Sequence, residues 1–114
     1  MDSEYFDLSR IYELKDLMGS EVGPIVASML ATMTGAIEEV ETALAASDLD
    51  RATRAAHAAR NDALMLGAVP LQQALSDLEA ATRLLDEARA RAALAQLRKI
   101  WPATRAGLAA ASAN

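Results

Sequence analysis

The sequence predicts an all-α protein, and three observations support this fold class. The chain is rich in alanine, leucine, glutamate and arginine, which have the highest helix propensities. Aromatic residues make up only 4% of the chain, and valine and isoleucine are also sparse, so strands have little to build from. Apolar residues recur at three- and four-residue steps between short turns. We expect an antiparallel up-down four-helix bundle with a short additional N-terminal helix.

Size and charge narrow the functional classes. With 114 residues, the chain has the length of one domain, which we expect to span residues 1–114. The net charge is −5 and the basic residues are scattered, which argues against a nucleic-acid partner. The chain has no cysteine, so disulfides and thiolate metal sites are excluded. One histidine is too few for an all-protein zinc site.

The start of the chain is acidic and carries no signal sequence. No apolar run approaches the roughly 20 residues that a membrane span needs. We therefore expect a cytoplasmic protein with no membrane partner. We also expect a monomer, and no metal-binding motif appears in the sequence.

The first predicted helix covers about residues 8–18, with Asp7 or Ser9 as the N-cap. Its apolar face consists of Leu8, Ile11, Tyr12 and Leu14.

The second helix is predicted to begin at about Ser20, whose side chain is a good N-cap. Pro24 is tolerated because it falls in the first turn. A long stripe of apolar residues follows at helical spacing: Val22, Ile25, Val26, Met29, Leu30, Met33, Ile37, Val40 and Leu44. Methionines in such a stripe usually fill a core, so we assign them no cofactor role.

The third helix is predicted for about residues 49–66, with Asp48 as the N-cap and Gly67 as the C-terminal stop. Its apolar stripe consists of Leu49, Ala52, Ala56, Ala59, Ala63 and Leu66.

The fourth helix is predicted to start at Val69-Pro70, because proline suits the first helical position. Its stripe consists of Leu71, Ala74, Leu75, Leu78, Ala81, Leu85 and Ala88. The last helix is predicted for about residues 89–109, with a kink at Pro102. Its candidate core residues are Leu94, Leu97, Ile100, Trp101 and Leu108.

His57 is the most informative residue of the third helix. At about 100° per residue, it points roughly 130° away from the centre of the alanine stripe. We therefore predict that it faces solvent. Other residues lie on its side or at the edge of its side: Asp50, Arg54, Arg60, Asn61 and Leu64.

An isolated exposed histidine is most often an ordinary surface residue, but its neighbours favour a function. The adjacent alanines, at positions 55, 56, 58 and 59, leave the imidazole accessible to a partner. Arg60 lies one turn further on and is within reach of an anion held by His57. A neutral imidazole has a free ring nitrogen that can attack phosphorus.

The segment from Ala55 to Ala68 resembles the signature of histidine-containing phosphotransfer (HPt) domains. That signature reads roughly Ala-His-x-(Leu/Ala)-Lys-Gly-x-Ala-x-x-Leu-Gly-Ala. In this chain the matching positions are Ala56, His57, Arg60, Ala63 and Leu66-Gly67-Ala68. Leu71 and the Leu78-Glu79 pair fit the family's next helix, and Asp50 fits an acidic residue often found upstream.

The resemblance implies a phosphoryl carrier of a two-component phosphorelay, without independent kinase activity. His57 would be the phosphoacceptor, receiving the group from a receiver-domain aspartate or a hybrid histidine kinase pathway and passing it to a response regulator. Arg60 would offset the phosphoryl charge. The partner receiver domain would supply Mg²⁺. Asn61, Arg54, Leu64 and exposed parts of the second helix would form the docking surface.

Two positions depart from the family pattern. Asn61 stands where the family usually has glycine, so it fills space beside the histidine that a partner would otherwise enter. Arg60 replaces the commoner lysine, which keeps the charge but changes the geometry.

Two alternatives stay open at this point. A degenerate HPt-like helical adaptor would bind or sequester a receiver domain without phosphotransfer, and Asn61 favours this alternative. An independent enzyme would need an acid–base pair, for which Glu38, Glu39 and Glu41 are candidates. Such a run of charges is more typical of a solvated helix face.

Overall fold

The structure, a computed structural model, describes residues 4–113. Within that range it contains helices and no strand, which confirms the predicted fold class. The elements, in chain order, are α1 (Leu8–Met18), the 3₁₀ turn η1 (Gly19–Glu21), α2 (Val22–Ala45), α3 (Leu49–Met65), α4 (Val69–Arg83) and α5 (Glu87–Ser112). No helix in the described part of the chain combines the length and apolar character needed to cross a membrane.

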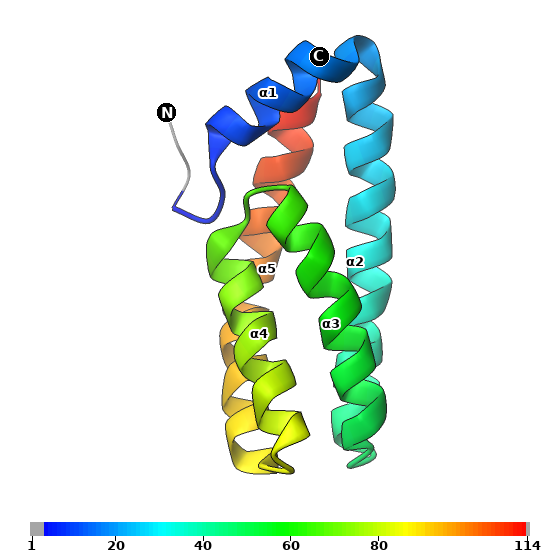
Figure 1. Ribbon diagram of the computed structural model, residues 1–114, viewed down its shortest axis with the longest axis vertical. Coiled ribbons are helices and arrows are strands. Elements are labelled where there is room, and N and C mark those ends of the chain that lie inside the picture. Colours follow the sequence, from blue (N-terminus) through cyan, green and yellow to red (C-terminus); the bar gives the residue numbers. More distant parts are fainter. Residues whose placement is uncertain (1–3, 114) are drawn as a thin grey trace.

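Helices α2 to α5 run alternately up and down and form an antiparallel bundle (Figure 1). Each packs against its neighbours in the order α2, α3, α4, α5 and back to α2. Helix α1 lies across the end where α2 begins and α5 ends (Figure 1). The segment before α1 is tied to the α3–α4 turn, because the Asp7 amide donates to the Gly67 carbonyl at 3.0 Å.

Helices α3 and α4 contribute side chains of different size to the core. The buried residues of α3 are all alanines: Ala52, Ala55, Ala56, Ala59 and Ala63. The buried apolar residues of α4 include the larger Leu71, Leu75 and Leu78. Small side chains on one helix let the neighbouring backbones approach closely, so α3 lies close against both of its partners.

The three turns of the bundle share one geometry. In each, the amide of the residue before the next helix donates to a carbonyl five residues back, at 2.8–2.9 Å, and the residue preceding it has a positive φ. This is the Schellman arrangement that ends many helices. The positive-φ residues are Ser47, Gly67 and Leu85. Only at Gly67 does the packing also favour glycine, because an added Cβ would lie 3.1 Å from the Arg10 side chain.

The N-caps predicted for α1 and α3 are confirmed, whereas the one predicted for α2 is not. Asp7 and Asp48 cap α1 and α3, as expected, by accepting hydrogen bonds from the Ser9 and Arg51 amides. The prediction for Ser20 was wrong. Ser20 lies inside η1, and α2 begins with no side-chain cap. The residue before α2 has a helical backbone, whereas a capping side chain needs an extended one.

Four predicted stripe positions were also wrong. Tyr12 and Ile25 are exposed, because each lies at the margin of its helix's apolar face. Leu85 and Ala88 are exposed because α4 ends at Arg83, and the turn rotates the following residues away from the α4 stripe. Helix α5 extends from Glu87 to Ser112, beyond both predicted ends, and continues through Pro102.

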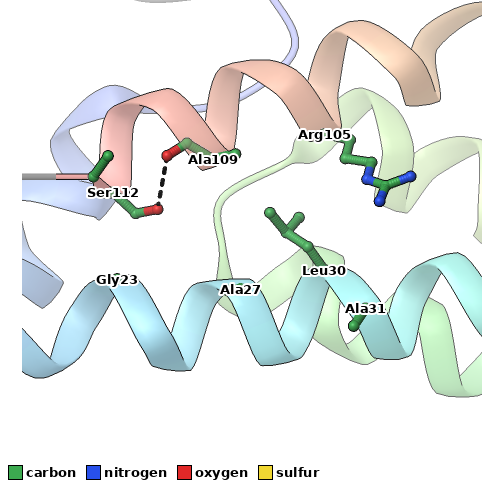
Figure 2. Close-up of a pocket in the computed structure, with 8 residues that line it drawn as sticks. Gly23, Ala27, Leu30, Ala31, Arg105, Ala109 and Ser112 are labelled. Carbon is green, nitrogen blue, oxygen red and sulfur yellow. Dashed lines mark hydrogen bonds between the residues drawn. The ribbon is translucent and has the colours of Figure 1, made fainter.

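The α2–α5 edge of the bundle carries a groove of about 400 Å³. Figure 2 shows α2 along one side of it and α5 along the other. Small residues line most of it, including Gly23, Ala27 and Ala109, and Arg105 lies at its margin. In the order of helices this edge is opposite the α3–α4 edge, where His57 lies.

Candidate functional site

His57 lies on α3 with 48% of its side chain exposed. The alanine stripe predicted behind it is buried, so the helix turns the imidazole towards the surface, as predicted. Of the adjacent alanines, Ala58 is exposed and Ala55 is buried. The imidazole is therefore accessible on one side, whereas its other side faces α4.

The side of the ring that faces α4 meets a carboxylate. The Nδ1 atom of His57 lies 3.3 Å from both Oε1 and Oε2 of Glu79. The Glu79 side chain is only 8% exposed. A buried carboxylate is costly unless it is paired and hydrogen-bonded, so its surroundings decide whether it is charged.

Two arginines complete the surroundings of Glu79. Arg83, one turn further along α4, donates to Glu79 Oε2 from Nε and Nη2 at 3.1 and 2.8 Å. Arg60 reaches across from α3, with Nε 3.5 Å from Glu79 Oε1 and Nη2 3.1 Å from His57 Nδ1. His57, Arg60, Glu79 and Arg83 thus form one network across the α3–α4 edge, and we call it the Glu79 network.

The Glu79 network keeps the carboxylate ionised. Burial raises the pKa of Glu79, because desolvation disfavours the charged form. Hydrogen bonds from Arg83 and His57, together with the nearby charge of Arg60, act in the opposite direction. They outweigh burial, so the pKa of Glu79 lies below its ordinary value. The site therefore presents a fixed negative charge to Nδ1 of His57.

The remaining ring nitrogen, Nε2, has no hydrogen-bond partner within residues 4–113. When Nδ1 carries the proton and donates it to Glu79, the lone pair lies on Nε2. This arrangement can do nucleophilic chemistry with a group that approaches from solvent.

The other predicted site residues lie on the same helix but outside the network. Arg54 is exposed and forms an ion pair with Asp50, one turn before it. Asn61 and Leu64 are exposed on α3 beyond His57. Among these predicted site residues, Arg60 is the one that forms a hydrogen bond with His57 within residues 4–113.

Glu79 and Arg83 were missed as site residues by the sequence reasoning, although the sequence carries a signal for them. Glu79 follows Leu71 and Leu75 at four-residue steps, so it falls on the buried stripe of α4. A glutamate on such a stripe needs a cationic partner, and Arg83 stands four residues later.

Two of the three glutamates in the candidate acid–base cluster on α2 form ion pairs with other helices. Glu39 pairs with Arg51 of α3, and Glu41 pairs with Arg98 of α5 at 2.9 Å. Within residues 4–113, no group of three or more histidine or acidic side chains is placed to hold a metal ion.

Comparisons with known proteins place the chain in a family. The model of the Hpt domain matches residues 24–111, well over half of the chain. A crystal structure of histidine-containing phosphotransfer protein B (HptB) from Pseudomonas aeruginosa PAO1 superposes with a TM-score of 0.87, at 20% identity. The match covers 94% of this chain and 93% of that one, and it shows a shared fold. No curated protein sequence matches significantly. The chain belongs to the Hpt domain family, whose members are phosphoryl-carrying signalling proteins and not kinases.

Proposed function

We propose that this protein carries a phosphoryl group on Nε2 of His57 in a two-component phosphorelay. It accepts the group from an aspartyl phosphate of a receiver domain, or from a hybrid histidine kinase, and passes it to a response regulator. The observation that carries the proposal is the orientation of the ring, with Nδ1 against buried Glu79 and Nε2 without a partner. Family membership supports the same role.

The transfer step follows from this orientation. The Nε2 lone pair forms a bond to phosphorus, the bond between phosphorus and the aspartyl oxygen breaks, and its electron pair returns to the partner's carboxylate. The proton stays on Nδ1, where Glu79 accepts its hydrogen bond. In onward transfer, an aspartate oxygen of the response regulator forms a bond to phosphorus, the P–N bond breaks, and its electron pair returns to Nε2. Glu79 is thus a positioning residue, because it stabilises the ring charge that develops during transfer.

The protein itself needs no cofactor in this scheme. Mg²⁺ and the acidic residues that hold it belong to the receiver domain, which provides most of the charge stabilisation.

The docking surface proposed around His57 includes Arg54, Asn61 and Leu64, all exposed on α3. It continues into a hollow of about 220 Å³ beside Leu64, which α1, the residue before it and the start of α4 help to line. Arg10 fixes this corner by donating from Nε to the Met65 carbonyl at 3.0 Å. Helix α1 lies outside the matched residues 24–111, and we propose that this corner contributes to partner preference.

The experiment is a label-transfer assay. Receiver domains from the source cell are phosphorylated with ³²P and incubated with the protein. We expect an acid-labile label to appear on the wild-type protein and to be absent from His57→Gln. The matched control is Arg105→Gln, which changes an exposed residue on the opposite edge and is expected to accept label at the wild-type rate. Failure of the wild-type protein to accept label from any receiver would refute the proposal.

A non-catalytic adaptor remains the second candidate because Asn61 is exposed on the face of His57. Its side chain stands where a small residue would leave room for the partner's active site. An adaptor would bind a receiver domain with the same affinity before and after His57→Gln and would take up no label. Isothermal titration calorimetry of the wild-type protein and of His57→Gln against the same receiver domains distinguishes the two functions.

A further inference from the structure

The two polar partners of His57 Nδ1 make incompatible demands on it. A guanidinium can only donate hydrogen bonds, so Arg60 Nη2, at 3.1 Å, needs a lone pair on Nδ1. A carboxylate can only accept, so ionised Glu79, at 3.3 Å, needs a proton there. Each partner therefore selects a different tautomer of the neutral ring.

The two tautomers differ in reactivity. With the proton on Nδ1, the lone pair lies on exposed Nε2, and the ring is a nucleophile towards solvent. With Arg60 bonded to the Nδ1 lone pair, the proton lies on Nε2, and the exposed nitrogen cannot attack phosphorus.

We propose that Arg60 and Glu79 compete for Nδ1, and that Arg60 restrains the free protein by holding part of the population in the non-nucleophilic tautomer. The role of Arg60 as a restraint rests on the proposed carrier function. The competition between Arg60 and Glu79 for Nδ1 does not depend on that function. An incoming phosphoryl group relieves the restraint, because its negative charge draws the Arg60 guanidinium away from Nδ1. When Arg60 moves away, Glu79 keeps its two hydrogen bonds from Arg83, both on Oε2.

The restraint acts locally because two charged groups, Glu79 and Arg60, contact Nδ1. Arg83 is bonded to Oε2 of Glu79, whereas Arg60 approaches Oε1 and Nδ1. Removal of Arg60 therefore leaves the carboxylate paired and available to accept the Nδ1 proton.

The chain contains a single histidine, so its tautomer can be measured without ambiguity. Long-range ¹H–¹⁵N spectra of labelled protein, recorded at about pH 9 where an imidazole is neutral, give the ratio of the Nδ1–H form to the Nε2–H form. We expect Arg60→Met to raise this ratio by about threefold or more, the factor that corresponds to the loss of one hydrogen bond. We expect Glu79→Met to lower it by a similar factor, because Arg60 is then the remaining partner of Nδ1.

Arg54→Met is the matched control, because Arg54 lies on the same face of α3, one turn before His57, and pairs with Asp50. It should leave the ratio at the wild-type value. If Arg60→Met and Arg54→Met give the same ratio, the competition is refuted, whether or not the protein carries phosphoryl groups. Circular dichroism of each variant verifies that the bundle is intact.

Release by an anion is tested with inorganic phosphate. Added to the wild-type protein, phosphate should raise the Nδ1–H fraction relative to sodium chloride of equal ionic strength. The Arg60→Met variant should not respond. An unchanged ratio in the wild-type protein would overturn the release step.

Discussion

A carboxyl group lies on each flank of α3, and the two carboxyl groups differ in their burial and in their partners. On the flank that faces α4, Glu79 is buried and is bonded by Arg60, Arg83 and His57. On the other flank, Asp62 is partly buried, and its side chain has no hydrogen bond or ion pair within residues 4–113. Asp62 lies eleven residues, or three turns, after Arg51, which pairs with Glu39 of α2, so this flank faces α2.

The pKa values of the two carboxyls show the consequence. Burial alone raises the pKa of Asp62. Burial also raises the pKa of Glu79, but the hydrogen bonds and cations around it lower the pKa further than burial raises it. The position of a carboxyl in a helix bundle thus does not decide its charge, because its partners do. Only on the α4 flank do hydrogen bonds and nearby cations keep a carboxylate ionised beside His57.

The largest effect is expected from removing the charge on the α4 flank. Glu79→Met should slow phosphoryl acceptance by about tenfold or more, because Nδ1 loses the acceptor that leaves the lone pair on Nε2. Its free energy of unfolding should fall by about 2 kcal/mol, because Arg60 and Arg83 lose their charged partner, and the loss is moderated because Arg83 is largely exposed to water. Single-turnover label transfer and urea unfolding measure the two quantities. Wild-type transfer by this variant would show that Glu79 does not position the ring.

A smaller effect is expected on acid stability. Because the folded-state pKa of Glu79 is lowered, its charge stabilises the fold above the ordinary pKa of 4.5, and this contribution is lost as the pH falls through the folded-state value. At pH 7, Glu79→Gln should lower the free energy of unfolding by about 1–2 kcal/mol. The difference from the wild type should shrink in acid. Urea unfolding between pH 7 and pH 3 tests this, and a difference that grew in acid would contradict it.

The smallest effect is expected on the α2 flank, with the opposite sign. The raised folded-state pKa of Asp62 means that its charge opposes folding above that pKa, and that the penalty disappears below the ordinary value of 3.8. Asp62→Asn should therefore raise the free energy of unfolding at pH 7 by about 0.5 kcal/mol. It should also leave label transfer unchanged. Destabilisation at pH 7 would show that Asp62 has a favourable partner in solution.

Much of the fold could be predicted because it depends on local periodicity. The five helices, the exposed face of His57 and the caps Asp7 and Asp48 all follow from residues close together in the sequence. The failures at Tyr12 and Ile25 lie at the margin of an apolar face, and the others lie where one helix meets the next. Ser20 did not cap α2 because a 3₁₀ turn joins α1 to α2 without an extended residue. Leu85 did not join the α4 stripe because the helix ended two residues earlier.

The amino-acid sequence by itself determined the helices, the alanine face of α3 and the exposure of His57, because apolar spacing along one helix fixes which side is buried. It also placed Arg60 one turn from the histidine. Only the tertiary structure brought Glu79, held by Arg83, to Nδ1 of that histidine, since these residues stand more than twenty positions away on another helix. Their contact depends on the distance between α3 and α4 and on which faces of the two helices pack together. The packing of the two helices therefore decided which nitrogen of His57 faces Glu79 and which has no hydrogen-bond partner within residues 4–113.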